Sequence, residues 1–130
     1  MDRDRWLRIA LRALAVIFIF GVFPLMQFWP SGWRWSPHNH EYEQMIMAVY
    51  AVLGVFLFLA SRNPAEHRSL LQFTLWSSVA HGTVMMVHAL SNANEHWHLV
   101  ADVPALFVVA GVLGALMPPE PARQAQARRS

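Results

Sequence analysis

The chain has 130 residues, of which 55% are hydrophobic and only 14% are charged, and this apolar fraction exceeds that of typical soluble domains. It has no lysine, so its ten strongly basic residues are all arginine, and the formal net charge at pH 7 is +2. It also has no cysteine, which excludes disulfides, thiolate metal sites and thiol catalysis.

The apolar residues fall into four runs. The sequence predicts four membrane-spanning helices, at about residues 8–29, 42–61, 68–91 and 98–117. Each run is long enough to cross a bilayer core of about 30 Å. Pro24 is expected to kink the first span, and the turn at Asn63 and Pro64 makes the second and third spans antiparallel neighbours. We therefore predict one transmembrane domain over residues 1–118, followed by a disordered basic tail at 119–130.

The arginines predict the orientation of these spans. Nine of the ten lie in the N-terminal tail and the first turns of the first span, around the turn between the second and third spans, or after the fourth, and Arg34 is the exception. Because arginines near short loops stay in the cytoplasm, both termini are expected to be cytoplasmic. The predicted fold class is all-α, an integral membrane four-helix antiparallel bundle. Such a multi-pass protein is expected to contact the lipid bilayer along its outer surface.

The third predicted span carries polar side chains on one face. At helical spacing this face contains Thr74, Ser77, Ser78, His81, Met85, His88 and Asn92. Polar groups inside a membrane are costly unless they face protein or water. His81, near the middle, is expected to bond with Ser77, Tyr50 or a backbone carbonyl. The open alternative is that His81 relays protons in a carrier or membrane enzyme.

Imidazole and carboxyl groups gather near the predicted outer end of the spans. His98 and Asp102 are four residues apart and His40 and Glu43 are three apart, so each pair shares a helix face. In an antiparallel bundle these pairs meet His88 at the end of the third span. Such ligands suit Zn²⁺ or copper, and binding of a divalent metal or a metal-containing cofactor is the predicted function. The open alternative is that Asp102 only caps its helix or pairs with His88.

Haem b is a further cofactor to consider, because histidines in membrane helices ligate it. His81 and His88 are the candidate ligands, but seven residues along a helix is about 10 Å, too far for both to hold one iron. A haem with two histidine ligands needs His88 together with His98 or His96.

The fourth predicted span carries four small residues at a spacing that lets a neighbouring helix approach, namely Ala110, Gly111, Gly114 and Ala115. This pattern predicts a homo-oligomer or a larger membrane complex, in which the chain is an accessory or structural subunit. Nucleic-acid binding is not expected, because the arginines flank the spans instead of forming one basic patch.

Three segments carry a resemblance to known proteins: RWLRIALR (Arg5–Arg12), WPSGWRW (Trp29–Trp35) and ASRNPAEHRSL (Ala60–Leu70). They resemble a family of small bacterial four-span membrane proteins without an assigned function. The resemblance implies the same topology and a location in the bacterial inner membrane. It implies no catalytic residues.

Overall fold

The computed structural model describes residues 2–34, 40–120 and 122–130, and these residues are predominantly helical. In chain order the elements are α1 (Asp2–Val16), the π-helical segment η1 (Ile17–Gly21), α2 (Val22–Phe28), α3 (Pro30–Trp33), α4 (His40–Ala60), the 3₁₀ segment η2 (Pro64–His67), α5 (Arg68–Ser91), the 3₁₀ segment η3 (Ala93–Val100), α6 (Asp102–Leu116) and α7 (Ala122–Arg129). No strand occurs in the described ranges, so the all-α prediction is confirmed.

Three helical runs in the described part of the chain are long and apolar enough to cross a membrane: Asp2–Phe28, Glu41–Ala60 and Ala93–Leu116. They correspond to the first, second and fourth predicted spans, and they give the chain the character of a membrane protein. Helix α5, the third predicted span, has 24 residues but is not one of the three. Its polar face lowers its mean hydropathy.

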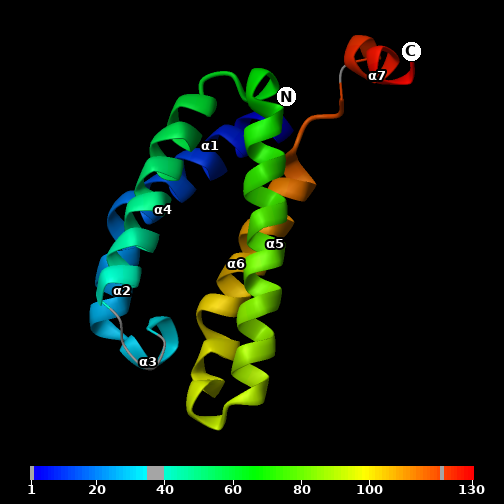
Figure 1. The fold of residues 1–130 in the computed structure, drawn as a ribbon. Helices are drawn as coiled ribbons and strands as arrows, with labels where there is room; N and C mark the ends of the chain where they lie inside the picture. Colours follow the sequence, from blue (N-terminus) through cyan, green and yellow to red (C-terminus); the bar gives the residue numbers. More distant parts are fainter. Residues whose placement is uncertain (1, 35–39, 121) are drawn as a thin grey trace.

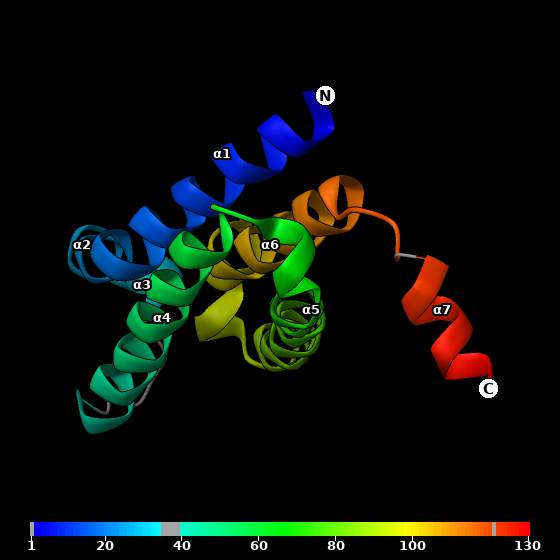
Figure 2. The same ribbon diagram turned by 90° about the horizontal axis from the view of Figure 1, so that it is seen from above.

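The long helices form two layers. Helices α1 and α4 pack together in one layer and α5 packs along α6 in the other, while α1 also contacts α6. Figure 1 shows successive long helices running in alternate directions, with the N-terminus, the turn between α4 and α5, and α7 at the same end of the molecule. The view from above in Figure 2 shows α1 running obliquely along one side of α4 and α6.

An apolar core joins the two layers near the end that holds the chain termini. It contains Leu7, Leu11, Ala15, Phe18, Leu57, Leu71, Val109 and Leu113. Most of these residues lie at the starts of α1 and α5 or the ends of α4 and α6, where the layers meet. The layers are thus held together at one end.

Arginines of α1 reinforce this end by binding backbone carbonyls. Arg3 donates from Nε and Nη2 to the Ala115 oxygen at 3.1 and 2.8 Å. Arg8 donates to the Ser61 oxygen at 3.3 Å and also to the Arg62 oxygen. The last carbonyls of a helix lack partners within it, and cations near a helix C-terminus are favourable. These arginines therefore tie α1 to the ends of α4 and α6.

The C-terminal segment differs from its prediction, because a helix (α7) covers Ala122–Arg129 where we expected a disordered tail. Alanine, arginine and glutamine are good helix formers, which favours a helix over this segment. Arg128 Nε lies 3.2 Å from Glu120 Oε1. Helix α7 lies apart from the other helices in both views (Figures 1 and 2).

Candidate functional site: a cavity between the helical layers

A cavity of about 690 Å³ lies between the two layers. Small-molecule sites typically have volumes of about 300–1,000 Å³. Its walls come from α1, η1 and α2 on one side, α4 on another, and α5 and α6 opposite. Most of the lining is aliphatic or aromatic, and the polar or partly polar side chains in it are Trp33, Tyr42, Glu43, Tyr50, His81, His88 and Asp102. The cavity is therefore suited to a mainly apolar molecule.

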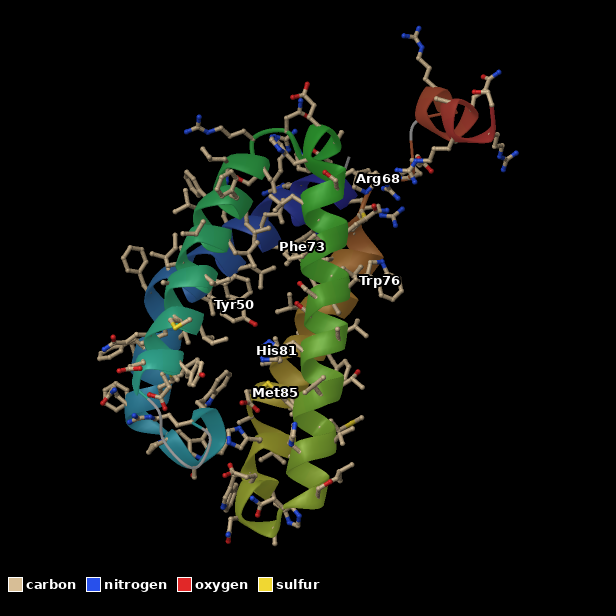
Figure 3. All side chains as sticks on the ribbon, viewed as in Figure 1. Tyr50, Arg68, Phe73, Trp76, His81 and Met85 are labelled. Atoms are coloured by element: carbon tan, nitrogen blue, oxygen red, sulfur yellow. The ribbon has the colours of Figure 1, made fainter. Side chains whose placement is uncertain are left out.

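Tyr50 and His81 form a polar contact across the cavity. Tyr50 Oη lies 2.9 Å from His81 Nδ1, and the two rings are stacked with centroids 6.3 Å apart. Figure 3 shows the two side chains pointing toward one another from α4 and α5, with Met85 one turn along α5. Tyr50 was one of the partners that the sequence offered to His81, and the structure selects it.

An ion pair fixes the start of α4 at the other end of the cavity. Arg34 donates from Nε to Glu43 Oε1 at 3.1 Å and from Nη2 to Glu43 Oε2 at 2.8 Å. Both side chains are more than four-fifths buried, and paired bonds of this kind are strong and directional. The pair holds Arg34, the residue that follows α3, against α4.

His98 joins Arg34 to η3 and α6. Its ring is completely buried, with 0% exposure. Nδ1 lies 2.7 Å from Asp102 Oδ2, while Nε2 lies 3.0 Å from Glu95 Oε2 and 3.1 Å from the Arg34 carbonyl oxygen. Arg34 thus touches both layers, with its side chain on α4 and its backbone on His98. We call these five residues (Arg34, Glu43, Glu95, His98 and Asp102) the polar rim.

The structure brings together some of the residues that the sequence placed in a metal site. His98 and Asp102 are in contact as their spacing predicted, and Asp102 and Glu43 both line the cavity. His88 lines it from the last turn of α5. The side chain of His40 lies outside the described residues.

The geometry of the polar rim does not favour metal binding. Among the described side chains, no group of three or more His, Asp or Glu residues could hold a metal ion. Both ring nitrogens of His98 already face oxygen atoms, so neither points at open space. These contacts instead make His98 a structural link between η3, α6 and Arg34, the residue that follows α3.

Sequence reasoning missed two members of the polar rim as site residues. The sequence singles out Arg34 only as the exception among the arginines, and it does not single out Glu95. The signal for Arg34 was its isolation: a single arginine among carboxyl groups at the opposite end from the other nine is favourably placed for an ion pair. The partner could not be chosen without the fold.

No curated protein and no solved structure matches the chain. A family model does match, described as a family of unknown function (DUF6632), and the match covers residues 3–130. This confirms the resemblance to a family without an assigned function. Because the match covers nearly the entire chain, the protein belongs to the DUF6632 family.

Proposed function

We propose that this protein is a four-span membrane protein with both termini in the cytoplasm, and that it binds a mainly apolar small molecule in the cavity between its helical layers. The observation that carries the proposal is the cavity of about 690 Å³ with its mostly apolar lining. The bacterial inner membrane is its proposed location.

The exposed surface supports a membrane environment. Large apolar side chains point outward along the helices, including Val49 (67% exposed), Trp76 (66%) and Phe20 (70%), and Figure 3 shows Trp76 directed away from the other helices. Soluble monomers rarely expose contiguous apolar patches larger than a few hundred Å². Helix α5 presents such side chains too, which supports it as a fourth span despite its lower hydropathy.

The charge distribution supports the orientation. Nine arginines lie at the end that holds the chain termini, while Glu41, Glu43, Glu95 and Asp102 lie at the other end with Arg34. Membrane proteins keep arginine-rich short loops and tails in the cytoplasm. The polar rim then faces the outside of the cell.

The experiment is mass spectrometry of small molecules extracted from the purified protein, compared between two variants of α5. Val84 lines the cavity, whereas Val87 does not, and their exposures are 56% and 55%. Tryptophan at position 84 adds bulk to the cavity wall, so Val84→Trp should lower the amount of copurified molecule. Val87→Trp makes the same change on lipid-facing surface and should retain the wild-type amount.

Four results would contradict the proposal. Absence of any copurified apolar molecule from the wild-type protein removes its basis, and so does equal retention by the two variants. Stoichiometric zinc, copper or haem in elemental and optical spectra would favour the predicted metal or haem site instead. Copurification of large membrane proteins in place of a small molecule would favour an accessory subunit that packs through α6.

A further inference from the structure

We propose that the molecule bound in the cavity is neutral and carries a carbonyl oxygen, which accepts a hydrogen bond from Nε2 of His81. This inference rests on the proposed binding function and adds the chemical class of the ligand. It follows from the charges, the protonation pattern and the shape of the cavity wall.

The ionised side chains in the cavity wall already face opposite charges or donors. Glu43 is paired with Arg34 through two contacts, and Asp102 contacts the ring of His98. A charged ligand would have to leave water for an apolar cavity without an unengaged counter-charge there, and burial of an uncompensated charge is strongly unfavourable. The cavity therefore favours a neutral molecule.

The hydrogen bond between Tyr50 and His81 fixes which nitrogen of the ring carries the proton. A phenol hydroxyl both donates and accepts, whereas each nitrogen of a neutral imidazole does only one of the two. The described residues offer the Tyr50 hydroxyl no acceptor other than His81 Nδ1. We therefore assign the hydroxyl as donor to Nδ1, which places the ring proton on Nε2. In the described part of the chain Nε2 has no protein partner, so the donor is available to an acceptor in the cavity.

The apolar wall beside this donor is partly aromatic. Phe18 packs edge-on against Tyr50 with ring centroids 5.0 Å apart, and both rings line the cavity with His81. Flat rings stack favourably on such surfaces. A carbonyl on a flat ring, as in an alkylated quinone, fits this wall, and the carbonyl of a fatty ester offers the same acceptor on a flexible chain.

The test measures binding of three probes to the full-length protein in lipid nanodiscs, with protein-free nanodiscs as the blank. The probes are a decyl-substituted para-benzoquinone, methyl decanoate and decylbenzene, which has no acceptor. His81→Phe should weaken quinone binding about fivefold, which corresponds to about 1 kcal/mol for a neutral hydrogen bond, and leave decylbenzene binding unchanged. His81→Gln keeps an N–H donor and should restore part of the affinity. His96→Phe, at an exposed histidine outside the cavity, is the matched control.

Infrared spectra add a direct readout. The carbonyl stretch of the bound quinone should lie at lower frequency in the wild-type protein than in His81→Phe, because a hydrogen bond weakens the C=O bond. Weaker ester binding in His81→Phe would support a carbonyl contact with a flexible ligand. Weaker quinone binding in the same variant would support a carbonyl contact with a ligand that carries a flat ring.

Failure of this inference can be told from failure of the proposed function. If the wild-type protein binds decylbenzene as tightly as the quinone and ester, and His81→Phe changes none of these affinities, the carbonyl contact is wrong while the binding function stands. If the wild-type nanodiscs retain no probe above the blank, both proposals are wrong.

Discussion

At the scale of single residues, His98 shows how a buried polar group is made stable. The ring is inaccessible to solvent, and Asp102, Glu95 and the Arg34 carbonyl lie around its two nitrogens at 2.7 to 3.1 Å. Glu95 lies in η3, Asp102 begins α6, and Arg34 follows α3. Removal of the ring would leave two buried carboxyl groups without their shared contact.

We expect His98→Ala to lower the free energy of unfolding by about 1–3 kcal/mol, because buried carboxyl oxygens lose a hydrogen-bond partner and stay out of reach of water. His96→Ala, at an exposed position two residues away, should change it by no more than about 0.5 kcal/mol. Thermal unfolding of the detergent-solubilised protein, followed by circular dichroism, measures both. Equal losses in the two variants would show that His98 does not stabilise the outer end.

At the scale of helices, α4 and the first helical run approach one another closely. A Cβ atom at Gly54 would lie 2.8 Å from Ile19 Cγ1 and 3.0 Å from the Ala15 carbonyl oxygen.

Opposite Gly54 the first helical run (Asp2–Phe28) contains the π-helical turn η1, which ends three residues before Pro24. Proline has no N–H to donate to the carbonyl four residues earlier, and a π-helical turn often marks a functional site. Here η1 supplies Phe18 to the cavity wall.

Substitution of Gly54 tests this close approach. Gly54→Ala should lower the free energy of unfolding by about 1–3 kcal/mol, since the added methyl group would overlap the Ile19 side chain and crowd the Ala15 carbonyl oxygen, and overpacking is destabilising. In Gly111→Ala the new Cβ would meet no atom within 4 Å, and the higher helix propensity of alanine should leave stability unchanged or raise it by up to about 1 kcal/mol. Titration of the folded fraction with a denaturing detergent compares the two. A loss in Gly111→Ala as large as that in Gly54→Ala would contradict the predicted packing.

At the scale of the whole molecule, the two ends differ in chemistry. Arginines of α1 bind the carbonyls at the ends of α4 and α6 at one end, and the polar rim joins the layers at the other. The cavity lies between these two sets of contacts. If the arginine end faces the cytoplasm, the polar rim lies at the outer surface and the cavity lies within the depth of the membrane.

The absence of cysteine makes this orientation directly testable with single-cysteine variants. Asn94→Cys, in the exposed part of η3, should react with a membrane-impermeant maleimide added to intact spheroplasts. Asn63→Cys, in the turn between α4 and α5, and Ser130→Cys, at the C-terminus, should react only after permeabilisation, because both lie at the arginine end. Labelling of Ser130→Cys but not Asn63→Cys in intact cells would show an odd number of spans after the turn and refute the four-span topology.

The sequence by itself determined the helical fold class and the places of the long helices, because the period of apolar residues and the length needed to cross a bilayer are local properties of the chain. It also predicted the contact of His98 with Asp102 from helical spacing, although the two residues lie in η3 and α6, on either side of the non-helical Ala101. The tertiary structure alone decided which layers meet and what lies between them. The contacts of Arg34 with Glu43 and His98, and of Tyr50 with His81, join residues 9, 64 and 31 positions apart. Such contacts depend on how helices pack against each other, which periodicity does not specify. For the same reason the cavity wall supplied by the first helical run could not be predicted from the sequence.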